Sequence, residues 1–202
     1  MKNSRAIAIF SLLLSAAWTA SAEPLVTSKQ ELTALDYFKH GRQSGCGIRT
    51  TAVAADDRSI NVLLSVFSNE AGPPFGMFKV VVRKMINNGE PLQDGKPGYS
   101  SIGKIHYAWL KTAGGAELSP NKNETASHGE GYMTSLKFSS AMDMLGAIAQ
   151  TDFTIGISTD QQAPDTVFAF NQRISQNEAG KLFICMKNLR DALDGKPSAE
   201  VY

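Results

Sequence analysis

Residues 153–193 read FTIGISTDQQAPDTVFAFNQRISQNEAGKLFICMKNLRDAL, and this stretch decides the fold class. Residues 153–158 and 166–172 are short segments rich in β-branched and aromatic side chains, which is typical of strands. Ser175 and Glu178 then form a capping box, and apolar side chains recur at helical spacing after it. The stretch therefore predicts two strands followed by an amphipathic C-terminal helix.

The predicted C-terminal helix carries one continuous apolar stripe, formed by Ala179, Leu182, Met186, Leu189 and Leu193. Cys185 lies three residues after Leu182 and four before Leu189, so it shares their face. Gly195 and Pro197 follow the last turn and are typical of a helix end. We therefore expect Leu182, Met186 and Leu189 to be core residues, with Cys185 facing inward.

The chain before this stretch contains further strand segments with β-branched residues or alternating polarity, namely 48–54, 60–67, 77–86, 102–110 and 132–138. A second helix is predicted over 140–150. Strands joined by short turns, with helices interrupting late, favour an antiparallel sheet over a doubly wound parallel fold. The prediction is an α+β fold, mainly an antiparallel β-sheet or sandwich of about seven strands with two to three helices, including the C-terminal amphipathic one.

The start of the predicted domain has a helical pattern of its own. Ser28 and Glu31 form a capping box, and apolar side chains follow at Leu32, Leu35 and Phe38. Gly41 is suited to a left-handed turn that would end this helix. We therefore expect a short N-terminal helix, followed by a loop of small residues over 41–47.

Residues 1–22 have the features of a secretory signal peptide. The cationic start of the chain precedes an apolar run over 6–20, and Ala20-Ser21-Ala22 forms a cleavage site. The apolar run has 15 residues, whereas a bilayer core needs about 20. We expect cleavage after Ala22, a single domain over 23–202 without a transmembrane segment, and a periplasmic or secreted location.

The overall charge of the chain is nearly balanced, with 20 Lys and Arg against 19 Asp and Glu in 202 residues. This balance argues against nucleic acid as a partner, because a protein that binds many phosphates carries a basic excess. Residues 77–111 are locally basic, with a net charge of +4. Scattered, solvated lysines are the favoured explanation, and a basic sheet face that meets an acidic partner is the alternative.

The two cysteines, Cys46 and Cys185, are 139 positions apart. In an exported chain an even cysteine count favours a disulfide. The alternative is a cysteine hydrolase of peptide or cell-wall amide bonds, with Cys46 as the nucleophile and His106 or His128 as the base. The residues after Cys46 read as a strand, whereas such nucleophiles commonly begin a helix. The sequence therefore favours the disulfide.

No other motif predicts a cofactor, a metal or a catalytic residue. Residues 98–104 match most of a phosphate-binding loop, but Ile105 stands where Ser or Thr would hold magnesium, and a strand follows instead of a helix. The three histidines, His40, His106 and His128, form no closely spaced pair, so no metal site is assigned.

The functional prediction is a non-enzymatic, exported binding or accessory protein of the cell envelope, which acts through a protein or envelope partner. The cysteine hydrolase is the enzymatic alternative. A third hypothesis is a binder of small molecules with a pocket between the sheet and the helices near Trp109.

Overall fold

The computed structural model describes residues 23–86, 98–119, 131–160 and 165–195, so the predicted signal peptide and His128 lie outside the described residues. Within these ranges ten strands and two helices follow one another as β1 (Leu25–Lys39), β2 (Arg42–Ala54), β3 (Arg58–Phe67), β4 (Phe75–Met85), β5 (Tyr99–Ser101), β6 (Tyr107–Thr112), β7 (Glu117–Leu118), β8 (Gly131–Lys137), α1 (Phe138–Ile148), β9 (Phe153–Ser158), β10 (Thr166–Phe170) and α2 (Gln176–Leu193). The strands form one sheet in the order β5-β4-β3-β2-β1-β10-β9-β6-β7, and β8 also pairs with β4.

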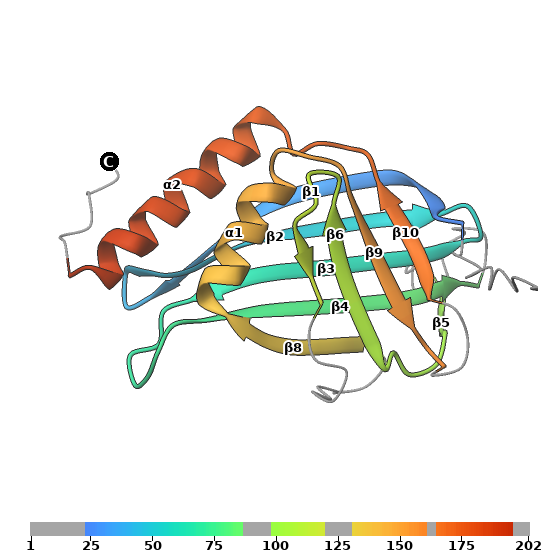
Figure 1. Ribbon diagram of the computed structural model, residues 1–202, viewed down its shortest axis with the longest axis horizontal. Helices are drawn as coiled ribbons and strands as arrows, with labels where there is room; N and C mark the ends of the chain where they lie inside the picture. The colour runs from blue at the N-terminus through green and yellow to red at the C-terminus, as the bar shows by residue number, and fades with distance from the viewer. Residues whose placement is uncertain (1–22, 87–97, 120–130, 161–164, 196–202) are drawn as a thin grey trace, which may run out of the picture.

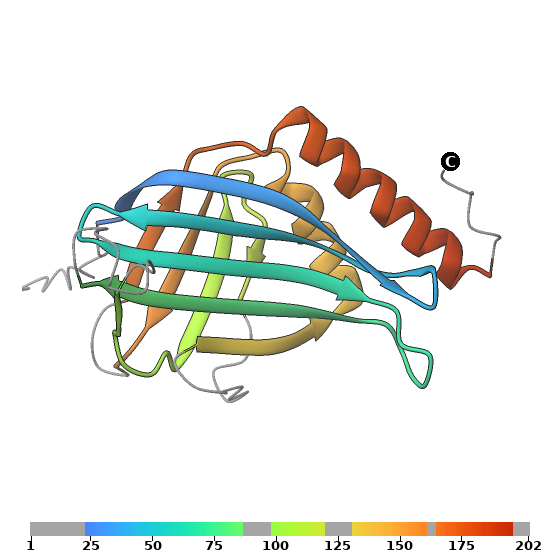
Figure 2. The same cartoon turned by 180° about the vertical axis from the view of Figure 1, so that it is seen from behind.

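The sheet curls over on itself at β1 (Figure 1). β1 is antiparallel to β2 along most of its length but parallel to β10, which it pairs only through Leu25 and Val26. As a result, the crossing strands β6, β9 and β10 lie over β2, β3 and β4 (Figure 1). The view from behind shows the long strands, β1 to β4, as an outer layer (Figure 2). The sheet is therefore mixed, because the junction of β1 with β10 is parallel, although the other strand pairs are antiparallel as expected.

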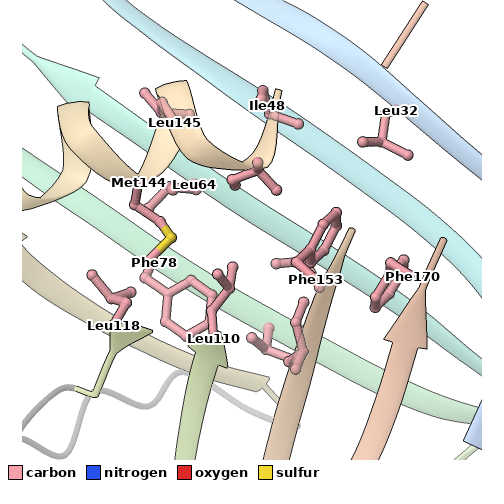
Figure 3. Close-up of a cluster of buried hydrophobic side chains, with 14 of the residues drawn as sticks. Leu32, Ile48, Leu64, Phe78, Leu110, Leu118, Met144, Leu145, Phe153 and Phe170 are labelled. Carbon is pink, nitrogen blue, oxygen red and sulfur yellow. The ribbon is translucent and has the colours of Figure 1, made fainter. Parts of the chain in front are cut away.

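The core fills the space between the two crossing parts of the sheet and α1. Leu64 and Phe78 point into it from the long strands, Leu110 and Phe153 from the crossing strands, and Leu145 from α1 (Figure 3). α1 packs on β3, β4 and β8, while α2 packs on β1 and β2. The helices therefore cover the concave side of the sheet, and in the described part of the chain neither of them lies on the outward face of β2–β4.

The predicted N-terminal helix is wrong, because residues 25–39 form the long strand β1. The capping-box pattern of Ser28 and Glu31 coincides with an irregularity in the pairing of β1 with β2, and Lys29 has a left-handed φ of 47°. Pairing with β2 through eleven residue pairs outweighs the weak local helix preference of so short a segment. Gly41 does adopt a left-handed φ, of 74°, but in the β1–β2 hairpin turn.

The predicted loop over 41–47 is also wrong, because residues 42–47 belong to β2. Gly45 and Gly47 pair with Phe67 and Ser65, and a β-carbon on either glycine would collide with β3. The small residues therefore mark close packing within a strand. The strand count rises from about seven to ten because β1, β5 and β7 were not predicted as strands, and the strand expected over 102–110 begins only at Tyr107.

The C-terminal helix agrees with the prediction. The Ser175 hydroxyl accepts a hydrogen bond from the backbone N–H of Glu178, and Leu182, Cys185 and Leu189 are buried. Met186 is only half-buried against the core, and Leu193 is 40% exposed. Within the described ranges, neither helix has the length and apolar character needed to cross a membrane.

Candidate functional site

Three exposed cationic side chains lie on the outward face of the long strands: Arg49 of β2, and Lys79 and Arg83 of β4. Strand alternation directs Phe78, Val80 and Val82 of β4 into the core, where they are fully buried. The intervening residues Lys79 and Arg83 are therefore exposed on the opposite face. This face is the one that no described helix covers.

A shallow depression of about 460 Å³ lies on this outward face, and we call it the basic depression. It is lined by Arg49, Ser59, Asn61, Leu63, Lys79, Val81, Arg83 and Tyr99. These residues come from β2, β3, β4 and β5, so the site depends on the register of four strands.

The strand register fixes the layout of the basic depression. Arg49 pairs with Leu63, which in turn pairs with Lys79, so the two cations lie two strands apart. Strand spacing places their Cα atoms roughly 10 Å apart. Arg83 lies four residues farther along β4, roughly 13 Å from Lys79. Asn61 lies between the three cations, opposite Val81.

The described lining of the basic depression carries positive charge only. No carboxylate is among the described residues that line it. Arg49 and Lys79 form no ion pair with another described residue. The outward carboxylate on β1 is Glu31, which pairs with Thr51 and accepts a long hydrogen bond of 3.5 Å from Thr33. The surface therefore offers positive charge together with neutral hydrogen-bonding side chains.

An aromatic row lies on the same outward face, at the other end of the strands. The ring of Tyr37 lies 4.9 Å from that of Phe67, which stacks on Phe75 at 5.4 Å. Gly45, between Tyr37 and Phe67 in the sheet, has no side chain and so leaves room for these rings. Phe75 is 37% exposed, so the row contributes apolar surface beside the basic depression.

A second groove, of about 340 Å³, lies between the β1–β2 hairpin, the segment after β3 and the end of α2. Its main ion pair joins Lys39 Nζ to Glu70 Oε2 at 2.8 Å. The hydrogen bond from Lys39, supported by the charges of Lys39, His40 and Arg42, lowers the pKa of Glu70 from its usual value. The charges of this groove are thus partly paired with each other, whereas Arg49 and Lys79 of the basic depression form no ion pair with another described residue.

Cys46 and Cys185 form a disulfide, with their Cα atoms 5.8 Å apart. Both residues are buried, and the bond joins the inward side of β2 to α2. The buried amide of Gln43 lies against it, with Nε2 2.9 Å from Cys185 Sγ and donating to the Gly45 carbonyl at 2.8 Å. Cys46 therefore has no free thiol, and it lies within β2 and not in the loop that the sequence predicted over 41–47.

The structure does not bring the other predicted candidates into one site. His40 lies in the β1–β2 hairpin, whereas His106 precedes β6 and donates its backbone N–H to Ser158. Trp109 covers Gly156 on the face of β6 and β9 that points away from the core, and its indole N–H donates to Asp165 at 2.7 Å. This position differs from the predicted pocket between sheet and helices.

The sequence offered a basic sheet face only as the alternative to scattered, solvated lysines, and it pointed to only part of the basic depression. Lys79 and Arg83 belong to the basic segment 77–111, but Lys111 lies on β6 and Lys104 precedes that strand. The contributions of Arg49, Asn61 and Tyr99 become visible only when β2, β3 and β5 are aligned in register with β4. Polar residues at alternate positions of β2 and β3 were the available signal.

No family model, curated protein or solved structure matches this chain. Within the described part of the chain, no group of three or more His, Cys, Asp or Glu side chains is arranged to hold a metal ion. The chemistry that the outward face offers is the binding of anionic groups by Arg and Lys, with hydrogen bonds from Ser, Asn and Tyr.

Proposed function

We propose that the protein is an exported, non-enzymatic accessory protein of the cell envelope that binds an anionic envelope component through the basic depression. The observation that carries this proposal is the placement of Arg49, Lys79 and Arg83 around one depression without a lining carboxylate among the described residues. Charged groups arranged in this way steer an oppositely charged partner toward the surface and hold it there.

The covalent state of the cysteines supports the exported location. Disulfides form and persist in oxidising compartments such as the periplasm and the extracellular space. The disulfide between Cys46 and Cys185 suits such a compartment, as does the signal-peptide pattern of residues 1–22.

The enzymatic alternative lacks its nucleophile in this covalent state. A cysteine hydrolase attacks with a thiolate, and the Cys46 sulfur is bonded to Cys185. Binding therefore agrees with the geometry better than covalent catalysis does.

The proposed function is tested by reversing two charges of the basic depression. The protein in its mature form, beginning at Glu23, is mixed with isolated envelopes of the source organism, and the sedimented fraction is measured at rising salt concentration. We expect salt-sensitive binding of the wild type, and at least a tenfold weaker affinity for the double variant Arg49→Glu, Lys79→Glu, since both exposed cations become repulsive.

The matched control is the double variant Lys104→Glu, Lys111→Glu, which makes the same charge change at exposed positions outside the basic depression. It should bind envelopes within about twofold of the wild type. Equal loss of binding in the two double variants would show that net charge, and not this depression, governs binding. Unchanged binding in Arg49→Glu, Lys79→Glu would reject the proposal.

A further inference from the structure

We propose that the anionic component is a glycan, that is, a sugar chain with carboxylate or phosphate groups, which lies along the outward face from the basic depression toward the aromatic row. This inference rests on the proposed function and specifies its ligand. It depends on three features of the face: the mixture of side chains in the depression, the spacing of the cations, and the aromatic surface farther along the same strands.

The depression combines charge with neutral polar and apolar surface. Ser59, Asn61 and Tyr99 supply hydroxyl and amide groups that both donate and accept hydrogen bonds. Leu63 and Val81 are half-buried between them and form an apolar floor. A sugar ring has hydroxyl groups around its rim and C–H groups on its faces, so it matches this mixture.

The cations are spread along the outward face and are not gathered at one point. Neighbouring cations are separated by roughly 10 to 13 Å between Cα atoms, and Arg49 and Arg83 by roughly 17 Å. Such spacing fits an extended ligand that carries several anionic groups, each within reach of one Arg or Lys. The neutral side chain of Asn61 lies between these charges, where the uncharged part of the ligand would pass.

The aromatic row extends the binding face in one direction. Phe75 and Arg83 are on the same strand and the same face, eight residues apart, which is roughly 27 Å. Half-buried Met77 and exposed Lys79 lie between them on that face. The partly exposed ring of Phe75 offers an apolar surface for the C–H face of a sugar. The face is therefore long enough for several sugar units.

The experiment compares three polyanions on the mature protein by isothermal titration calorimetry and amide chemical-shift mapping. The probes are a linear oligouronate, poly-L-glutamate of the same charge, and vesicles that contain anionic phospholipid. A neutral dextran oligosaccharide of matched length is the control. We expect the oligouronate to bind at least tenfold more tightly than poly-L-glutamate, with shifts along β2, β3 and β4.

Two variants separate sugar recognition from charge attraction. Asn61→Ala removes an exposed neutral side chain, so it should weaken oligouronate binding about three- to tenfold and leave poly-L-glutamate binding unchanged. Arg49→Glu, Lys79→Glu should abolish binding of both polymers. Vesicles loaded with an anionic glycolipid, compared with the free oligouronate, distinguish a membrane-attached glycan from a free one.

Equal binding of poly-L-glutamate and oligouronate, with no effect of Asn61→Ala, would overturn the glycan inference and leave the proposed function standing. Tighter binding to phospholipid vesicles than to the oligouronate would also overturn it. Absence of binding to all the polyanions, together with absence of envelope binding, would overturn both proposals.

Discussion

At the scale of single residues, the carboxylate of Glu178 joins the start of α2 to the edge of β1. One oxygen accepts the backbone N–H of Ala34 at 2.8 Å, and the other accepts from Lys181 Nζ at 2.6 Å. The hydrogen bonds from Lys181 and from Ala34 lower the pKa of Glu178 below its usual value of 4.5. A carboxyl with a lowered pKa in the folded state stabilises the protein above its unfolded-state pKa and loses this effect as the pH falls.

We predict that Glu178→Gln lowers the free energy of unfolding by about 0.5 to 1 kcal/mol at pH 7, because an amide oxygen replaces a charged acceptor at an accessible site. The difference from the wild type should shrink as the pH falls below the usual Glu pKa of 4.5. Urea unfolding between pH 3 and 7 measures it. A difference that does not depend on pH would contradict the assigned role of the charge.

Asp36 interacts with the charges of Glu178 and Lys181, and it provides a control in which the pKa shift has the opposite sign. Burial raises its pKa, as does the neighbouring charge of Glu178, although Lys181 opposes the shift. Ionisation of Asp36 therefore costs stability in the folded state as the pH rises. Asp36→Asn should raise the unfolding midpoint at pH 7 and have no effect at pH 3, the reverse of the trend for Glu178→Gln.

A second prediction at this scale concerns Gly156. A β-carbon at this position would overlap the indole of Trp109, so Gly156→Ala should displace the ring and break its hydrogen bond to Asp165. We expect a loss of about 1 to 3 kcal/mol, typical of overpacking. Trp109 is the only tryptophan in residues 23–202, so its fluorescence reports the displacement directly.

The matched control for Gly156→Ala is Gly146→Ala in α1, where an added β-carbon would meet no atom within 4 Å. That change should raise the stability by about 0.5 to 1 kcal/mol, because alanine favours a helix interior. Unchanged fluorescence in Gly156→Ala would contradict the assigned packing of the ring.

At the scale of elements, local sequence patterns predicted the helices and strands that are determined by their own residues. The capping box and apolar stripe of α2 are local, and the alternation of β4 gives its buried face directly. The pattern of β1 is ambiguous, because its apolar residues Leu32, Leu35 and Phe38 fit a helical spacing as well as a strand with irregular pairing. The long-range register with β2 decides between the two structures, and no local pattern contains that information.

The disulfide fixes α2 on the sheet, which leads to a prediction about both cysteines. Cys46→Ser and Cys185→Ser should each lower the free energy of unfolding by about 5 kcal/mol, since closing so long a loop restricts the unfolded chain. The denatured, unreduced wild type should show no reactive thiol. Two reactive thiols in freshly isolated protein, or an effect confined to one of the variants, would contradict the covalent link.

The apolar side of α2 supplies a separate prediction. Leu182 is fully buried, so Leu182→Ala should cost about 2 to 5 kcal/mol. Leu193, on the same helix but 40% exposed, is the control, and Leu193→Ala should cost less than about 0.5 kcal/mol. Urea unfolding of both variants measures the contrast, and similar losses would mean that the helix packs in a different orientation.

At the scale of the whole molecule, the candidate site depends on the same long-range register as the fold. Lys79 and Arg83 could be placed on one outward face from the alternation of β4 alone. Arg49 and Asn61 join them only because β2 and β3 pair with β4 in one particular alignment. A shift by one residue would turn Arg49 toward the core and remove it from the site. The sequence therefore predicted basic character but not its convergence.

The fold depends most on a short pairing at the junction of β1 and β10, where the two parts of the sheet meet. β1 pairs with β10 through only two residues, Leu25 and Val26. Three side-chain contacts extend this junction: Thr27 Oγ1 donates to the Ala169 carbonyl at 2.5 Å, Gln30 Nε2 donates to Asn171 Oδ1 at 2.8 Å, and the N–H of Gln172 donates to Gln30 Oε1 at 2.8 Å. The crossing strands are thus held to the long strands by a short backbone contact and the shared core.

We predict that a chain beginning at Ser28 separates the two parts of the sheet at this junction. It lacks Leu25, Val26 and Thr27, so the N–H and C=O groups of β10 that face β1 lose their partners. Hydrogen exchange should accelerate at least tenfold in β10, while β3, which is paired on both sides, keeps its protection. The control begins at Leu25 and lacks only Glu23 and Pro24, which precede the strand, so its exchange should match that of the chain beginning at Glu23. Unchanged protection of β10 in the chain beginning at Ser28 would mean that the core alone closes the sheet, and that the parallel pairing at the start of β1 contributes nothing to it.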